Sequence, residues 1–292
     1  MKYFTVYGNC QASVLAACLQ KVESFSRHFS YYRIAPCHRI NPGDYANLLS
    51  RLVDIDLLIA QPVTNQFRGG GFGVSSLIEM SSHCLLFPSL QFYGYFPSLS
   101  RLSLSSKSAS NQDLLRNLLA PFPALTKDSL FHYSEVRSLF QEGMASSNIC
   151  SKLDDGSLQR RSLPEIAEAS LLHMKEKESL FPDTISISDF IEETWRNRHL
   201  FYTPRHPSGL ILAEVVRRIC SSLDLKFTDR EYKLIQKRDH FSFLKLYIPA
   251  WIRSKYLANI DNAQAESYYS LTAVGTVFLL TSIYNHFPES LK

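Results

Sequence analysis

Short apolar runs, each closed by glycine or proline, constrain the fold of this chain more than any other feature. The runs and their ends are Tyr3–Tyr7 before Gly8, Asp56–Ala60 before Gln61-Pro62, and Cys84–Phe87 before Pro88. Apolar residues recur at helical spacing between Gln11 and Lys21, directly after the first run. Apolar runs that alternate with helices are typical of buried strands in a parallel sheet. The sequence therefore predicts an α/β fold, a doubly wound parallel sheet flanked by helices, with additional helices in the C-terminal half.

The length of the chain allows one or two domains. Folds of the α/β class with about 292 residues are often built around one core. We expect a single α/β domain over 1–292, with its core in about 1–225 and a helical extension over about 226–292. A long amphipathic helix that starts near Pro164 is predicted within Ser157–Lys177. Ser208 is a suitable N-cap for the helix predicted after it.

Composition and cysteine spacing favour a globular protein that acts on a small molecule or a glycan. Apolar residues make up 45% of the chain, and a formal net charge of +4 is too small to indicate a nucleic-acid partner. The six cysteines are far apart without a C-x-x-C pair, so we expect thiols in a reducing compartment and no metal site. No secretory signal is visible, and polar residues interrupt the apolar segment Tyr268–Tyr284. We therefore expect a cytoplasmic protein without a membrane span; its oligomeric state is unknown.

Cys10 is the first candidate for chemistry. It follows a predicted strand and the turn Gly8-Asn9, at the first turn of a predicted helix. Backbone N–H groups and the helix dipole favour a thiolate at such a place, so we expect the pKa of Cys10 to lie below the free value of about 8.5. The same pattern is also compatible with a small core residue, since cysteine is commonly buried.

His206 is the candidate base. It lies between Pro204 and Pro207, and the two prolines restrict the loop that orients the imidazole. The alternative is a histidine at a helix start that only bonds the backbone.

Several polar and basic residues are candidates for binding. Amides in the strand-end turns would donate to an oxyanion, and glycine there would allow close approach of substrate; the oxyanion or substrate residues are Gly8, Asn9, Gln11 and Gln61. A glycine-rich loop and scattered arginines would suit an anionic cofactor, although a solvated surface explains them as well; the candidates are Arg68, Gly70, Arg196, Arg198 and Arg205.

Motifs in a fixed order resemble the WcbI-type family of capsular polysaccharide biosynthesis proteins. They are Tyr7–Gln11, Ile59–Pro62, Phe87–Ser89 with Gly94–Pro97, and Leu200–Thr203 with His206-Pro207. The resemblance implies an SGNH-hydrolase-like three-layer sandwich in which cysteine replaces serine as the nucleophile, with coenzyme A or acyl-coenzyme A as the cofactor. By this resemblance Cys10 matches the nucleophile and His206 the late histidine. Thr203 stands where the SGNH pattern has aspartate, so the residue that orients His206 is not identified.

The leading hypothesis is an acyltransferase of capsule or exopolysaccharide biosynthesis that moves an acyl group from a coenzyme A thioester to a sugar hydroxyl. One alternative is an SGNH-like thiol esterase that deacylates saccharides. Another is a non-catalytic binding or scaffold protein of glycan assembly. For the enzymes we expect the sulfur of Cys10 within about 4–5 Å of a ring nitrogen of His206. We also expect that removal of His206 raises the pKa of the thiol.

Overall fold

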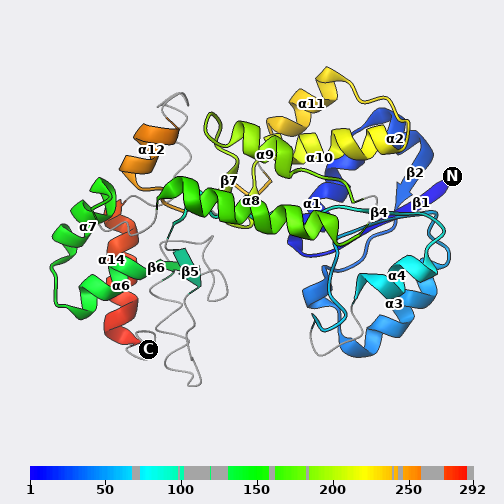
Figure 1. The fold of residues 1–292 in the computed structure, drawn as a ribbon. Coiled ribbons are helices and arrows are strands. Elements are labelled where there is room, and N and C mark those ends of the chain that lie inside the picture. Colours follow the sequence, from blue (N-terminus) through cyan, green and yellow to red (C-terminus); the bar gives the residue numbers. More distant parts are fainter. Residues whose placement is uncertain are drawn as a thin grey trace. The chain divides into compact units, whose positions relative to one another are not determined.

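The fold is that of a computed structural model (Figure 1), which describes residues 1–67, 73–97, 99–101, 119, 131–157, 162–181, 184–238, 240–242, 246–257 and 273–287. The chain divides into two compact units. The first unit comprises Met1–Gln91, Ala169–Thr194 and Arg205–His240, and the second comprises Phe92–Glu168, Trp195–Pro204 and Phe241–Lys292. Each unit thus combines segments that are far apart in the sequence. The single domain with a C-terminal extension stays a prediction.

A four-stranded parallel sheet forms the centre of the first unit. Its strands are β1 (Lys2–Tyr7), β2 (Phe29–Tyr31), β3 (Leu57–Ala60) and β4 (Cys84–Leu86), in the spatial order β2-β1-β3-β4. The register of β1 and β3 runs from Phe4 opposite Leu57 to Tyr7 opposite Ala60. β3 is buried throughout and β1 is buried from Phe4 onward, as expected of apolar strands with both faces covered. The predicted parallel sheet is confirmed.

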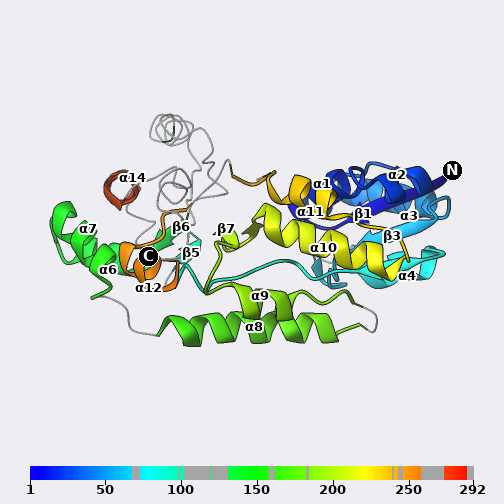
Figure 2. The same ribbon diagram turned by 90° about the horizontal axis from the view of Figure 1, so that it is seen from above.

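Helices cover both faces of this sheet and complete a three-layer α/β sandwich (Figure 1). On one face, α3 (Tyr45–Leu52) and α4 (Val74–Met80) pack on the strands through a core that includes Leu48, Leu77 and Leu58. On the other face lie α1 (Cys10–Leu19) and α10 (Gly209–Ser222). The remaining helices of this unit are α2 (Glu23–His28), α9 (Ser188–Thr194) and α11 (Asp229–Gln236), with the 3-10 turns η1 (Cys37–Arg39) and η2 (Pro42–Asp44). α11 packs beside α10 (Figure 2).

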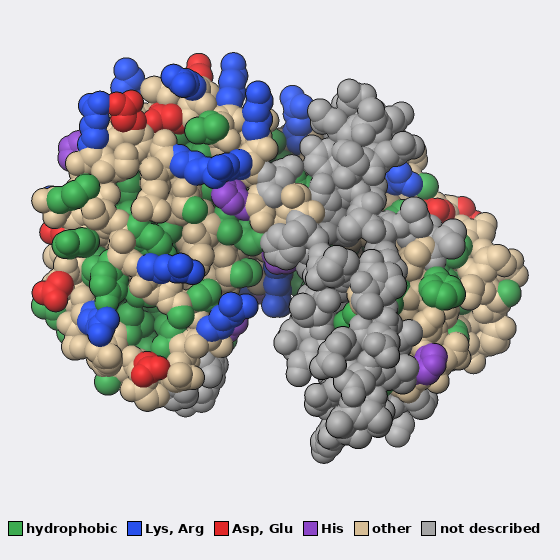
Figure 3. Space-filling view, turned by 180° about the vertical axis from the view of Figure 1, so that it is seen from behind, with side chains coloured by type: hydrophobic (Ala, Val, Ile, Leu, Met, Phe, Trp, Pro, Cys, Tyr) green, Lys and Arg blue, Asp and Glu red, His purple; other side chains and the backbone are tan. Residues whose placement is uncertain are grey.

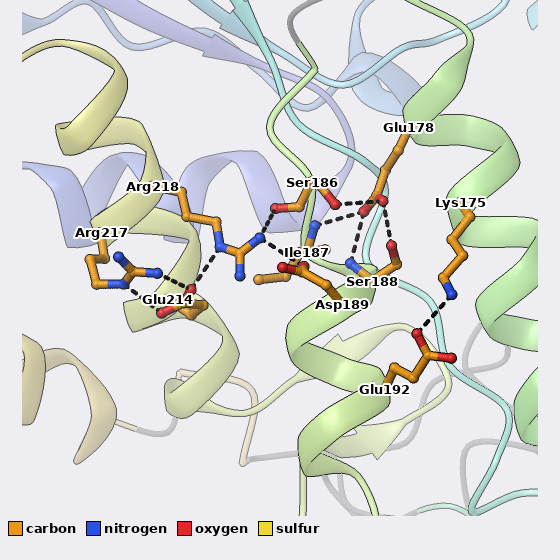
Figure 4. Close-up of polar contacts among 10 residues, drawn as sticks. All are labelled: Lys175, Glu178, Ser186, Ile187, Ser188, Asp189, Glu192, Glu214, Arg217 and Arg218. Atoms are coloured by element: carbon orange, nitrogen blue, oxygen red, sulfur yellow. Dashed lines mark hydrogen bonds and ion pairs between the residues drawn. The ribbon is translucent and has the colours of Figure 1, made fainter.

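The carboxylate of Glu178 closes the start of α9 (Figure 4). It accepts hydrogen bonds from the backbone N–H groups of Ile187 (2.7 Å) and Ser188 (3.0 Å). It also accepts from the hydroxyls of Ser186 (2.9 Å) and Ser188 (2.5 Å). A carboxylate at this position satisfies N–H groups that have no partner within the helix.

A buried carboxylate ties α10 to α9 (Figure 4). Glu214 accepts from Arg217 and from Nε of Arg218 (2.7 Å), and Arg218 also donates to Asp189 (2.7 Å) and to the carbonyl of Ser186 (2.9 Å). Burial raises the pKa of Glu214, but the hydrogen bonds from the two arginines outweigh burial and hold the pKa below its usual range. The network fixes the helix that begins three residues after His206.

The second unit combines a small antiparallel sheet with helices. Its strands β5 (Leu99–Arg101) and β6 (Phe131–Tyr133) pair with Leu99 opposite Tyr133. The other elements of this unit are α6 (Ser134–Gln141), α7 (Ser146–Asp155), β7 (Phe201–Thr203), α12 (Ala250–Tyr256) and α14 (Ala273–His286). α14 packs against α6 and α7.

Two predicted helices are observed, with bounds that differ by a few residues from those predicted. The helix predicted within Ser157–Lys177 is α8, which spans Leu163–Ser179. Its second residue, Pro164, needs no N–H because the first turn has no intrahelical acceptor for it. The helix predicted within Tyr268–Tyr284 is observed as α14, and residues 268–272 lie outside the described part. Among the described residues no helix is long and apolar enough to cross a membrane.

Candidate active site

Cys10 lies at the topological switch point of the parallel sheet. β1 and β3 are neighbours, with β2 beyond β1 and β4 beyond β3, so the chain leaves the two central strands in opposite directions. Open α/β sheets bind ligands at such a point, outside the carboxyl ends of the strands. Cys10 follows β1 after Gly8-Asn9, and Gln61 follows β3 directly. The candidate site is therefore at this edge of the sheet.

The turn after β1 presents backbone N–H groups to the thiol. Asn9 is the N-cap of α1, and its Oδ1 accepts a hydrogen bond from the N–H of Gln11 at 2.8 Å. The N–H groups of Cys10 and Gln11 also interact with the sulfur and favour its charged form. Nδ2 of Asn9 donates to Oγ of Ser89, which follows β4, at 3.2 Å. Asn9 is only half-buried.

Two buried glutamines hold this turn in place. Oε1 of Gln61 accepts from the N–H of Asn9 (2.8 Å), and Nε2 of Gln61 donates to Oε1 of Gln11 (2.9 Å). Gln11 accepts from the N–H of Leu90 (3.0 Å) and donates to the carbonyls of Leu90 (2.8 Å) and Arg205 (2.7 Å). Both N–H groups of the Gln11 amide are thus used inside the protein, which gives Gln11 a scaffolding role in this state.

Gly8 is required by the close approach of Gln61. A Cβ at position 8 would lie 2.5 Å from Oε1 of Gln61 and 2.9 Å from its Cδ. We expect Gly8→Ala to displace Gln61 and lower the free energy of unfolding by about 1–3 kcal/mol, because buried amide hydrogen bonds are lost. Denaturant unfolding checks this, with Gly43→Ala as the control, since nothing lies within 4 Å of a Cβ at Gly43. Equal stability of the two variants would contradict the prediction.

The loop of His206 is tied to the cysteine turn. His206 begins β8 (His206–Pro207) and is half-buried. The hydrogen bond from Nε2 of Gln11 to the carbonyl of Arg205 joins two residues that are 194 positions apart. This bond holds Arg205, which precedes His206, against Gln11, which follows Cys10. The two predicted catalytic segments therefore share one edge of the sheet.

The expected lowering of the thiol pKa is wrong for this structure. Burial raises the pKa of Cys10 above its ordinary value, although part of the residue is exposed. The helix N–H groups lower it, and so do the positive charges of Arg39 and Arg205, but they offset burial only in part. Desolvation of the thiol is the effect that the sequence did not reveal.

Burial also sets the protonation state of His206. It lowers the pKa of the imidazole to about 4, so the ring is neutral at pH 7. Thiol and imidazole are therefore both neutral in this state. A neutral ring has no cationic effect on the thiol, so the expectation that its removal raises the pKa of Cys10 is withdrawn.

Cys10 is expected to be alkylated first at limiting iodoacetamide, because it is exposed whereas the other five cysteines are buried or half-buried. The pH midpoint of labelling should lie above that of free cysteine, and Arg39→Ala or Arg205→Ala should raise it further, because each removes a charge that favours the thiolate. Peptide mass spectrometry across pH measures the midpoint, with Arg230→Ala on α11 as the control. A midpoint below that of free cysteine would contradict the burial effect.

The predicted cofactor residues fall in different places. Arg68 and Gly70 lie outside the described residues. Arg196 and Arg198 belong to the second unit, where Arg196 lies over the ring of Trp195 at 4.6 Å and the carbonyl of Arg198 accepts from Tyr95 at 2.7 Å. Of the three arginine candidates that the structure describes, Arg205 is the one whose charge acts on Cys10.

Sequence reasoning missed two residues of this site. Arg39 acts on the thiol from η1, whose Cys37 donates its N–H to the carbonyl of Gly8 at 2.8 Å. Ser89 holds the side chain of Asn9. Arg39 is distant from Cys10 in sequence and lies in no motif; Ser89 lies in a segment that marked the family resemblance, but its role there was not inferred. Within the described part of the chain no three His, Cys, Asp or Glu side chains are grouped to hold a metal ion.

Comparison with known proteins places the chain beside one family. Residues 3–228 match the family described as "Polysaccharide biosynthesis enzyme WcbI", a range that includes Cys10 and His206. A solved structure of WcbI, described as a novel polysaccharide biosynthesis enzyme in its native form without a disulfide bond between coenzyme A and a cysteine, has a TM-score of 0.69 at 19% identity. The match covers 99% of this chain and 98% of that one, and at this identity it shows a common fold. Among curated proteins there is no significant match.

Proposed function

Because the chain belongs to the WcbI family of polysaccharide biosynthesis enzymes, we propose that it transfers an acyl group from a coenzyme A thioester to a sugar hydroxyl through Cys10 and His206. The observation that carries the proposal is the exposed thiol at the switch point, joined to the loop of His206 by Gln11. The description of the WcbI structure names coenzyme A together with a cysteine, which supports coenzyme A as the ligand. Coenzyme A thioesters are metabolites of the cytoplasm, where we propose that the protein acts.

In the first half-reaction the sulfur of Cys10 attacks the carbonyl carbon of the thioester. His206, neutral above about pH 4, accepts the thiol proton. The bond from the acyl carbon to the sulfur of coenzyme A breaks, and His206 returns the proton to that sulfur. One thioester replaces another, so this exchange is close to balanced in free energy and a thiol is a suitable carrier.

In the second half-reaction a sugar hydroxyl attacks the acyl group on Cys10. His206 accepts the hydroxyl proton, the bond to Cys10 breaks, and the proton passes to the departing sulfur. The product is an oxygen ester, which is more stable than a thioester, so the transfer runs toward the sugar. Asn9 is the proposed oxyanion donor: the residue is half-buried, and its Nδ2 carries a second N–H beyond the one bonded to Ser89.

The remaining site residues have supporting roles in this proposal. Gly8 leaves room for the side chain of Gln61, and Gln11 and Gln61 hold the turn that positions the thiol. Contacts with the nucleotide part of coenzyme A remain proposals for Arg68, Gly70, Arg196 and Arg198.

Acceptor dependence of thioester cleavage tests the proposed function. Release of coenzyme A from acetyl-coenzyme A should increase at least about tenfold when a sugar acceptor is added, with the acetyl group recovered on the sugar. Cleavage at the same rate without acceptor would instead indicate the thiol esterase. Binding of coenzyme A without any turnover dependent on Cys10 would indicate the non-catalytic binding protein.

A further inference from the structure

Basic residues from three separate segments converge on the cysteine turn. η1, which ends at Arg39, is held to the turn by the hydrogen bond from Cys37 to Gly8 (2.8 Å). The backbone of Arg205 is held by the side chain of Gln11 (2.7 Å). The charges of Arg39 and Arg205 both act on the sulfur of Cys10. Lys177, near the end of α8, lies close enough to Arg205 for their charges to interact.

Lys177 is half-buried and lies near a second cation, Arg205. Burial and the charge of Arg205 both lower the pKa of Lys177. The carboxylate of the neighbouring Glu178 is directed to the start of α9, where it accepts four hydrogen bonds (Figure 4), and in the part of the chain that the structure describes it forms no ion pair with Lys177. Among the described residues neither Arg39 nor Lys177 forms an ion pair with a carboxylate. The helix dipole favours a cation near the C-terminus of α8, which explains Lys177 by itself. It does not explain why Arg39 and Arg205 come close from two other segments.

One edge of the first unit offers a contrast. On the edge of the first unit that carries α11, basic side chains are interspersed with acidic ones (Figure 3). Arg27 and Glu23 on α2, for example, form an exposed pair. Such a mixture is typical of a solvated face. Around Cys10, by contrast, the charged side chains that act on the sulfur are Arg39 and Arg205, and hydrogen bonds hold both of their segments to the cysteine turn; this arrangement favours an anion.

The phosphates of a coenzyme A thioester are badly placed to be this anion. Its pantetheine arm, which contains two amide units, separates the sulfur from the nearest phosphate by about 15 Å when extended. Charges interact appreciably in physiological salt only over about 8–10 Å. With the thioester at Cys10, an anion near Arg39 and Arg205 therefore belongs to the other substrate.

Resting on the proposed acyl transfer, we infer that the acceptor is an acidic sugar whose carboxylate or phosphate binds to Arg39, Arg205 and Lys177. The anionic group of the acceptor is held beside the thiol, and a nearby hydroxyl of the same sugar attacks the acyl group on Cys10. Arg39 is exposed and Lys177 is half-buried, and they belong to different segments. Because the cations lie near Cys10, the site would select a sugar whose anionic group is close to the hydroxyl that reacts.

The first test uses two alkylating probes that differ in charge. Iodoacetate should alkylate Cys10 about tenfold faster, relative to iodoacetamide, than it alkylates free cysteine, because the cations attract the anionic probe. This preference should fall severalfold in Arg39→Ala, Arg205→Ala and Lys177→Ala, and in high salt, but not in Arg230→Ala. A ratio equal to that of free cysteine would overturn the inference.

The second test separates the acceptor from the donor. Glucuronate and glucose 6-phosphate should protect Cys10 from iodoacetamide at concentrations at which glucose does not, and the protection should be lost in Lys177→Ala. Equal protection by glucose, or acyl transfer to glucose as fast as to the acidic sugars, would overturn the acidic acceptor while leaving acyl transfer in place.

The donor arm compares acetyl-coenzyme A with the acetyl thioester of N-acetylcysteamine, which has no phosphate. If Lys177→Ala raises KM for acetyl-coenzyme A only, the cations bind the donor and the inference fails. If KM for the acidic sugar rises severalfold with either donor, the inference holds. Protection by acidic sugars in a protein that transfers no acyl group would support the anion site and refute the proposed function.

Discussion

Cys10→Ser is expected to lower acyl transfer by at least about a thousandfold, the largest effect of any single substitution in this protein. A serine hydroxyl is a far weaker nucleophile than a thiol, and the acyl-serine that it would form is an oxygen ester, no more reactive than the product, so both half-reactions should be slow. The rate of coenzyme A release in the presence of a sugar acceptor measures the loss.

The fold should tolerate this substitution. Cys10 is exposed, so Cys10→Ser should change the free energy of unfolding by no more than about 0.5 kcal/mol. Cys150→Ser on the half-buried face of α7 is the matched control and should retain full transfer. Full activity of Cys10→Ser with unchanged stability would remove Cys10 from the mechanism.

His206→Gln is expected to lower transfer by about 10²–10⁴-fold, the usual contribution of a general base. The pH dependence distinguishes this role from a structural one. Because the reacting pair is a neutral thiol and a neutral imidazole with a pKa of about 4, its protonation does not change between pH 7 and 5, and the wild-type rate should stay level over that range.

The labelling of Cys10 supplies the control for His206→Gln. A neutral ring does not stabilise the thiolate by its charge, so the pH midpoint of iodoacetamide labelling should stay within about 0.3 units of the wild type. A wild-type rate that falls with a midpoint near pH 6.5 would show instead that His206 titrates as an ordinary histidine, contrary to the buried imidazole described above.

The sheet was predictable because its strands carry their own signals. Leu57–Ala60 is apolar at every position and ends before Gln61-Pro62, and a strand buried on both faces has few other interpretations. Helix bounds were less accessible. Gly156, at φ 75, ends α7 in the left-handed conformation, and α7 itself was not predicted.

The position of the cysteine turn could be predicted from its motif, but the side chains that surround the thiol could not. A cysteine after a strand and a Gly-Asn turn must lie at the carboxyl edge of the sheet, which is where Cys10 is observed. The internal hydrogen bonds of Gln11 and the charge of Arg39 depend on segments brought together by folding. The thiol pKa was predicted with the wrong sign for the same reason, because desolvation is a property of the tertiary structure.

The central claim is that Cys10 carries the acyl group between donor and acceptor. Mass spectrometry of the protein mixed with acetyl-coenzyme A, without acceptor and quenched in acid, tests it most directly. We expect one acetyl group on the peptide that contains Cys10, removed by hydroxylamine and by an acidic sugar acceptor, and absent from Cys10→Ser. An unmodified Cys10 under conditions in which acetyl-coenzyme A and sugar together still give acetylated sugar would contradict the covalent mechanism.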